Sequence, residues 1–167
     1  MDKALPLAHH PAPIRFYGGS MTSKQQAPSN EQWAELEMAA QLAAHQAYAP
    51  YSRFTVGAAI LDGSGKIHIG CNVENASYGL SNCAERTAIF AARANHGLQE
   101  VVAVCIYTPT DKPASPCGAC RQVLNEFGPT MHVRSICDGD EIIDTTLDAL
   151  LPSAFGPKNL QDASQKG

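Results

Sequence analysis

The sequence has no long apolar run and no excess of basic residues. No window approaches the roughly 20 apolar residues of a membrane-spanning helix, and the N-terminus lacks the apolar core of a signal peptide. Acidic residues outnumber lysines and arginines by 16 to 12, which gives a net charge of −4. Nucleic-acid affinity rests largely on basic side chains that neutralise phosphates. We therefore expect a cytoplasmic, single-domain protein with neither a membrane nor a nucleic acid as its partner.

The chain contains six cysteines. A short secreted chain could use them as a disulfide framework, but the missing signal peptide favours a reducing compartment. Three of them, Cys71, Cys105 and Cys137, lie in apolar, strand-like segments and are predicted to be buried free thiols. The other three lie in polar segments where helices are expected to begin: Cys83, Cys117 and Cys120.

Each of these helix starts carries capping residues. Ser81 and Asn82 are suitable N-caps for an alanine-rich helical run. Ser115 is a suitable N-cap for a second helix, and Pro116 suits its first turn. A helix N-terminus carries positive partial charge, which favours thiolate over thiol. Two such starts brought together would present three thiolates.

Three thiolates form a ligand set that selects Zn²⁺ over Mg²⁺ or Ca²⁺. Three protein ligands, not four, leave one position for water, which is typical of a catalytic zinc. Simpler interpretations exist, since Asn82-x-x-Glu85 could be a capping box and Cys117-x-x-Cys120 a redox pair. The combination, however, is a cysteine two residues before Glu85 and a Pro-Cys-x-x-Cys about 34 residues later. This is the known signature of zinc deaminases, in which the glutamate moves protons.

The rest of the chain predicts an α/β fold. A helix is expected over residues 30–48, a short one over 146–151, and strands over 55–61, 66–72, 101–107, 131–137 and 141–144. The first two strands should form an antiparallel hairpin, and the third and fourth should be parallel. This order implies a three-layer α-β-α sandwich around a mixed five-stranded sheet. Residues 1–28, rich in Pro, Gly, Ser and His, are predicted to be a flexible extension before a deaminase domain over 29–167.

Beyond the cysteines, residues 47–160 resemble the small homotetrameric cytidine deaminases. The similarity includes Ala-Tyr-Ala-Pro-Tyr-Ser-Arg-Phe at 47–54 and Gly-Cys-Asn-Val-Glu-Asn-Ala-Ser-Tyr-Gly at 70–79. It continues through Cys-Ala-Glu-Arg at 83–86, Ser-Pro-Cys-Gly-Ala-Cys-Arg at 115–121 and Leu-Leu-Pro-Ser-Ala-Phe-Gly-Pro at 150–157. Thr55 departs from the pattern, because the family often has proline there.

The resemblance implies a role for each matching residue. Cys83, Cys117 and Cys120 would bind one Zn²⁺ per subunit, and Glu85 would be the proton shuttle. The resemblance also implies contacts with the substrate: Asn72 and Glu74 would contact the ribose hydroxyls, and Phe54 and the Ala84 backbone would contact the base. The implied assembly is a homotetramer, in which Tyr78 and Phe155 would contact substrate at sites completed by neighbouring subunits. Tyr51 would join Tyr78 between subunits.

The expected reaction converts cytidine or deoxycytidine to uridine or deoxyuridine and ammonia, as in pyrimidine salvage. Because three thiolates and one Zn²⁺ sum to −1, we expect Arg86 to lie beside the sulfurs and to draw negative charge from them. An anionic Glu74 would repel a phosphate and so favour nucleosides over nucleotides.

Three other functions fit parts of the pattern. One is deamination of a cytosine nucleoside antibiotic of the blasticidin type. Another is a non-catalytic, zinc-stabilised binding module, which would need a fourth protein ligand such as Cys71, Cys105 or Cys137. The third is a nucleic-acid editing deaminase, which the acidic net charge disfavours.

Overall fold

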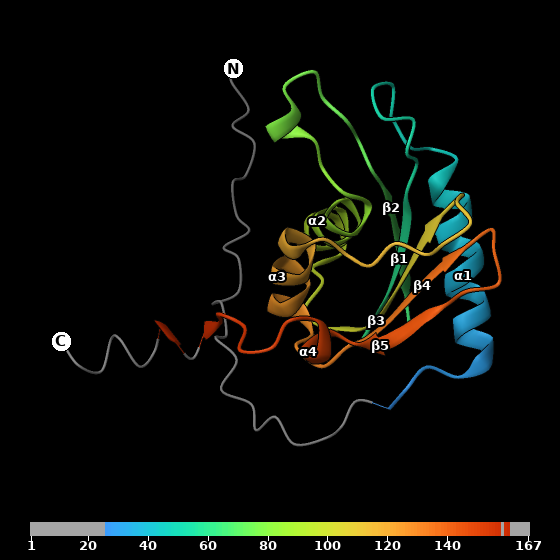
Figure 1. The fold of residues 1–167 in the computed structure, drawn as a ribbon. Coiled ribbons are helices and arrows are strands. Elements are labelled where there is room, and N and C mark those ends of the chain that lie inside the picture. The colour runs from blue at the N-terminus through green and yellow to red at the C-terminus, as the bar shows by residue number, and fades with distance from the viewer. Residues whose placement is uncertain (1–25, 158, 161–167) are drawn as a thin grey trace, which may run out of the picture.

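A mixed five-stranded sheet forms the middle layer of the computed structural model, which describes residues 26–157, 159 and 160 (Figure 1). The sheet runs in the order β2 (Ile67–Cys71), β1 (Gly57–Asp62), β3 (Val101–Thr108), β4 (His132–Cys137) and β5 (Ile143–Thr146). The β1–β2 hairpin is antiparallel and β3 pairs in parallel with β4, as predicted. The predicted extension lies outside the described residues except for 26–28, and its boundary stays a prediction.

Helices cover both faces of this sheet, so the predicted three-layer sandwich is confirmed. Helix α1 (Asn30–Ala44) lies on one face, and α2 (Ala84–His96) and α3 (Gly118–Phe127) lie on the other (Figure 1). Two short elements, η1 (Tyr78–Leu80) and α4 (Leu147–Leu150), complete the order. Within the described residues, no helix combines the length and apolar character that crossing a membrane would require.

Two hydrophobic cores hold the three layers together. Successive residues of a strand point to opposite faces, so β1 contributes Ile60 to the core under α2 and α3, and Ala59 and Leu61 to the core under α1. Trp33 and Leu36 anchor α1 in the second core. The sheet is therefore buried on both sides, which fixes where each helix begins relative to the strands.

Some element boundaries differ from the prediction. Helix α1 ends at Ala44 instead of continuing to residue 48, because the chain turns there and Tyr48 N–H donates to the carbonyl of Asn72 at 3.0 Å. Strand β5 begins two residues later than predicted, at Ile143. Glu141, expected to start that strand, instead turns its carbonyl toward the Cys137 thiol.

Helix α2 lies unusually close to the sheet at Gly70. A Cβ atom added to Gly70 would lie 2.3 Å from Ala88 N and 2.6 Å from Ala84 O, both in the backbone of α2. Only a residue without a side chain allows this approach. Since Ala84 directly follows Cys83, the contact sets the position at which the first cysteine helix begins.

We predict that Gly70→Ala lowers the free energy of unfolding by about 1–3 kcal/mol, because the added methyl must push the α2 backbone away from β2. Chemical denaturation followed by circular dichroism measures this loss. Gly79→Ala is the matched control, since a Cβ there meets no atom within 4 Å. Equal stability of the two variants would contradict the close packing described here.

Candidate metal centre

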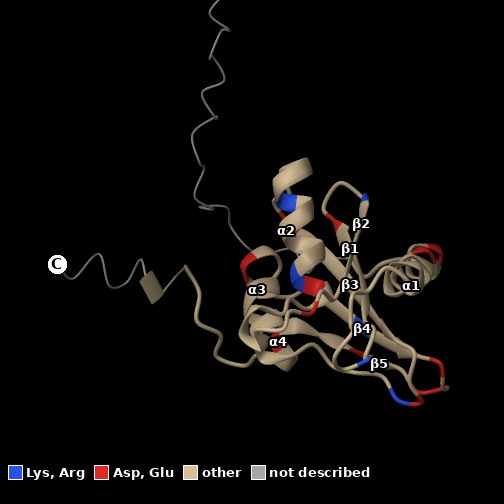
Figure 2. Ribbon diagram, turned by 90° about the horizontal axis from the view of Figure 1, so that it is seen from above, with Lys and Arg blue, Asp and Glu red and all other residues tan. Residues whose placement is uncertain are grey.

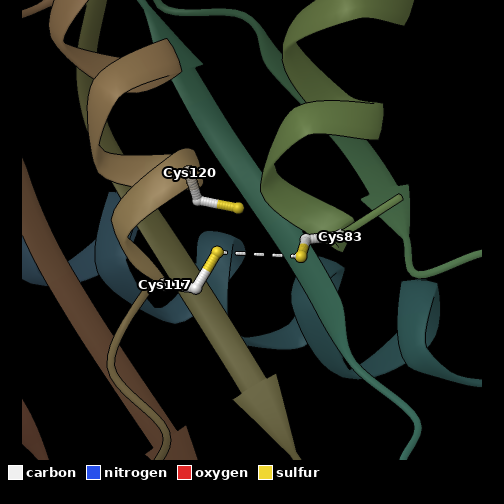
Figure 3. Close-up of side chains that lie close together, drawn as sticks. All are labelled: Cys83, Cys117 and Cys120. Atoms are coloured by element: carbon white, nitrogen blue, oxygen red, sulfur yellow. Dashed lines mark hydrogen bonds between the residues drawn. The ribbon is translucent and has the colours of Figure 1, made fainter. Parts of the chain in front are cut away.

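Three cysteine thiols converge where α2 and α3 begin (Figure 3). Cys83 and Cys117 occupy the N-cap positions of the two helices, and Cys120 lies in the first turn of α3. The three sulfurs all lie within 4.8 Å of one another, and Cys83 Sγ is 3.9 Å from Cys117 Sγ. A tetrahedral zinc with Zn–S bonds of about 2.3 Å would separate its sulfurs by about 3.8 Å. The donor set and its spacing therefore fit Zn²⁺.

The helix caps predicted from the sequence are wrong. Cysteines stand at both N-cap positions, and neither makes a side-chain capping hydrogen bond. The Asn82 side chain donates to Thr87 Oγ1 at 3.0 Å, and its N–H donates to the Val73 carbonyl instead of completing a capping box. Ser115 Oγ accepts from Arg121 at 3.0 Å. A sulfur thus lies at the positive end of each helix.

Arg86 lies beside the cysteines, where the sequence predicted it. Its Nη2 is 3.4 Å from Cys83 Sγ and 3.4 Å from the Ser81 carbonyl. Hydrogen bonds from Cys120 and then from Arg86 lower the pKa of Cys83 to about 5. The pKa of Cys120 is raised, because its hydrogen bond to Cys83 and its burial both favour the thiol. Cys83 accordingly ionises before Cys120.

Glu85 lies in the first turn of α2, two residues after Cys83, and is only 4% exposed. Its burial removes water from the carboxylate and raises the pKa of this side chain. A buried carboxylate with a raised pKa can both accept and return a proton near neutral pH. Within the described residues, the group that could hold a metal comprises the three cysteines alone, so Glu85 is not among its ligands.

Arg121 fixes the segment that carries Cys117. Its guanidinium donates to the Pro116 carbonyl at 2.7 Å, to Ser115 Oγ at 3.0 Å and to the Leu150 carbonyl at 2.8 Å. The last of these bonds ties the start of α3 to the end of α4. Arg121 therefore has a structural role in this site.

The remaining cysteines do not close the metal site. Cys71 donates to the Gln46 carbonyl, and Cys137 donates to the carbonyls of its own turn. Cys105 is fully buried in the core under α1, and burial raises its pKa to about 12. Cys105 thus matches the predicted buried thiol, whereas Cys71 and Cys137 are half-buried. No fourth cysteine joins the trio in the described part of the chain, which disfavours the binding module with a closed zinc site.

Asn72 and its neighbours lie next to the start of α2. Val73 forms an isolated bridge with Asn82, which places residues 72–74 beside Cys83. Asn72 is 9% exposed. Its Oδ1 accepts from Val56 N–H and its Nδ2 donates to the Phe54 carbonyl, both at 2.8 Å. The Asn72 side-chain amide therefore holds the Phe54–Val56 segment in place.

Glu74 has partners that the sequence analysis missed. Its Oε2 accepts from the backbone N–H groups of Tyr51 and Ser52 at 2.9 and 3.2 Å. Its Oε1 accepts from Ser52 Oγ. These hydrogen bonds, that from the Ser52 side chain above all, lower the pKa of Glu74. No local sequence signal joins two residues that lie 22 positions apart.

The aromatic residues assigned to the substrate site are exposed in the single chain. Phe54 is 43% exposed, Tyr78 75% and Phe155 59%. The Tyr78 ring lies 6.1 Å from the Tyr51 ring, centroid to centroid. Gln122 Nε2 donates to the Phe155 carbonyl at 2.8 Å and so fixes the backbone of the tail. Ala84, in contrast, is fully buried in the single chain.

Comparisons with known proteins all indicate the same family. Residues 30–135 match the family model "Cytidine and deoxycytidylate deaminase zinc-binding region". A cytidine deaminase of Halalkalibacterium halodurans is 49% identical over 118 residues, which cover 70% of this chain and 88% of that protein. A cytidine deaminase of Sporosarcina psychrophila is 46% identical over 125 residues, covering 74% and 91%. The resemblance noted in the sequence and the prediction of zinc are both confirmed.

Solved structures agree with these relatives. The crystal structure of cytidine deaminase from Burkholderia pseudomallei superposes with a TM-score of 0.70 at 49% identity, covering 73% of this chain and 98% of that chain. The enzyme from Mycobacterium tuberculosis gives a TM-score of 0.64 at 42% identity, covering 74% and 97%. Both the fold and the sequence therefore match across nearly the whole length of these relatives.

We predict that wild-type protein binds about one zinc ion per chain and that Cys83→Ser loses most of it, because a hydroxyl is a far weaker zinc ligand than a thiolate. Atomic emission of the purified proteins measures the ratio. Cys71→Ser is the matched control: its hydroxyl can still donate to the Gln46 carbonyl, and zinc should be retained. Full zinc occupancy in Cys83→Ser would contradict the assigned ligand set.

Proposed function

The chain belongs to the cytidine and deoxycytidylate deaminase family, and we propose that it catalyses the hydrolytic deamination of cytidine and deoxycytidine. The products are uridine or deoxyuridine and ammonia. The observation that carries the proposal is the convergence of three thiols beside the buried carboxylate of Glu85, at the start of α2. No feature of the site favours an antibiotic or a polynucleotide over a nucleoside.

Cys83, Cys117 and Cys120 would hold the zinc ion. A zinc ion bound there would polarise water and so supply a nucleophile at neutral pH. Arg86 contacts the Cys83 sulfur and offsets the negative charge that three thiolates concentrate in one place. The positive N-terminal ends of α2 and α3 also offset this negative charge.

Glu85 carries the proton transfers. Its carboxylate accepts a proton from the attacking water and delivers it to N3 of cytosine, which makes C4 electrophilic. The water oxygen adds to C4, so this carbon becomes tetrahedral. Glu85 then passes the remaining water proton to the amino group, the C4–N bond breaks, and ammonia leaves. The raised pKa of Glu85 suits a group that must act as base and then as acid.

Residues around the strand ends would bind the rest of the nucleoside. Asn72 and Glu74 would contact the ribose hydroxyls, and Phe54 and the Ala84 backbone would contact the base. The bridge between Val73 and Asn82 supports this assignment, since it brings the ribose-binding segment next to the metal site. Binding energy gained on the ribose orients C4, which lies some distance away.

The charge of the site favours a nucleoside over a phosphorylated substrate. The lowered pKa of Glu74 keeps this carboxylate anionic, and an anion there repels a phosphate. Figure 2 shows the lysines and arginines distributed over several elements and not gathered in one stripe. Some arginines are also paired with other groups of the protein. Arg134 pairs with Glu37 and Asp144, and Arg121 bonds to backbone carbonyls. The described residues thus offer no basic stripe for a polynucleotide.

The assembly in which the site works is proposed to be a homotetramer. Large apolar side chains are exposed in the single chain, among them Tyr51, Phe54, Tyr78, Leu80 and Phe155. A neighbouring copy would cover these side chains, and Phe155 and Tyr78 would then complete its site. The reaction belongs to pyrimidine salvage, and we place it in the cytoplasm, where six unpaired cysteines stay reduced.

We predict that Glu85→Gln lowers kcat for cytidine by roughly 10²- to 10⁴-fold, because the amide cannot transfer protons. Zinc content should stay at the wild-type level, since Glu85 is not a ligand. The loss of ultraviolet absorbance as cytidine becomes uridine measures the rate. Glu126→Gln is the matched control, because Glu126 is an exposed glutamate on α3, and its kcat should equal that of wild type.

The same assay separates the competing functions. Wild type should convert cytidine and deoxycytidine but not cytidine monophosphate, a blasticidin-type antibiotic or single-stranded DNA. A zinc-loaded wild-type protein that leaves both nucleosides unchanged would refute the proposal, whichever of the other substrates it converts.

A further inference from the structure

Ser52 lies between two residues assigned to the substrate and bonds to both. On the basis of the proposed function, we propose that Ser52 is a positioning residue that holds the Glu74 carboxylate toward the ribose. Ser52 Oγ contacts Glu74 Oε1, and Phe54 N–H donates to the same Oγ at 3.0 Å. Because the Phe54 N–H occupies an acceptor position of the hydroxyl, the hydroxyl proton points to Glu74. The Ser52 hydroxyl thus links the backbone of Phe54 to the carboxylate of Glu74, so that the positions of these two substrate contacts depend on each other.

The hydrogen bonds of Glu74 limit how many ribose hydroxyls this carboxylate can bind. An ionised carboxylate has about four acceptor positions. Tyr51 N–H and Ser52 N–H fill those of Oε2, and the Ser52 hydroxyl fills one on Oε1. One position on Oε1 is left for the substrate. Glu74 therefore accepts a hydrogen bond from a single ribose hydroxyl.

The turn that carries Ser52 is held from several sides. Arg53 has a φ of 58°, a left-handed conformation that a residue with a side chain adopts only when its surroundings enforce it. Its N–H donates to the Ala49 carbonyl at 3.0 Å. After the turn, the Phe54 carbonyl accepts from Asn72 Nδ2 at 2.8 Å. Ser52 is thus fixed in a rigid frame, and its hydroxyl is the part that reaches Glu74.

Loss of this hydroxyl should weaken substrate binding without slowing the chemistry. In Ser52→Ala, Glu74 keeps its two backbone donors but its Oε1 is free to rotate away from the ribose. We expect KM for cytidine to rise about five- to twentyfold while kcat stays within about twofold of wild type. Ser52→Thr keeps a hydroxyl at the same place and should restore most of the affinity.

The test is a double-mutant cycle with modified substrates. Wild type, Ser52→Ala, Ser52→Thr, Glu74→Gln and the Ser52→Ala/Glu74→Gln double variant are assayed with cytidine, 2′-deoxycytidine and 3′-deoxycytidine. If Ser52 acts through Glu74, its replacement should change KM by less than about twofold in the Glu74→Gln background. The same effect should also vanish for one deoxynucleoside, the one that lacks the hydroxyl held by Glu74.

The matched control is Ser64→Ala. Ser64 also donates its hydroxyl to a carboxylate, that of Asp62 at 2.6 Å, but in the β1–β2 turn. Its kinetics should equal those of wild type, and zinc content should be the same in all variants.

A Ser52→Ala effect that persists with Glu74→Gln and with both deoxynucleosides would overturn the role of Ser52, as would failure of Ser52→Thr to restore binding. A wild-type protein that does not convert cytidine would overturn the proposed function itself, and the ribose role with it. The two failures are therefore distinguished by the wild-type assay alone.

Discussion

Three cysteine sulfurs within 4.8 Å of one another form an arrangement that strongly disfavours three negative charges without a cation. The effects on the individual thiols show this conflict: the pKa of Cys83 is lowered, while that of Cys120, which donates a hydrogen bond to it, is raised. A divalent cation resolves the conflict, because it allows all three to ionise. The helix N-termini and Arg86 reduce the charge that remains. The chemistry of the site thus depends on how accurately two helix starts are held together.

That accuracy comes from the packing of the sheet. Gly70 lets the first turn of α2 contact β2 backbone to backbone, and Arg121 ties the loop before Cys117 to the end of α4. Because β2 and β3 both run antiparallel to β1, they share one direction, and the segments that lead from them to α2 and α3 leave from the same edge of the sheet. The apolar cores above and below keep these elements at fixed distances. The site is consequently built on rigid elements, as a centre that orients a reacting carbon requires.

Much of this could be predicted from the sequence. Hydrophobic runs and turn residues predicted the five strands, and the spacing of Cys83, Cys117 and Cys120 predicted the zinc site. The helix caps could not be predicted correctly, because Ser81, Asn82 and Ser115 are good caps by type and the structure uses their side chains elsewhere. The Ser52–Glu74 contact was missed for a different reason. It joins residues far apart in the chain, and nothing in the local pattern of either residue indicates the other.

The proposed reaction requires that three thiolates hold a zinc ion whose fourth position is open to water. X-ray absorption at the zinc edge of the wild-type holoprotein, without substrate, measures the ligands directly. We expect three sulfur atoms at about 2.3 Å and one oxygen or nitrogen atom at about 2.0 Å. Four sulfur atoms around the zinc would rule out the proposed reaction, because such a site leaves no position for the attacking water.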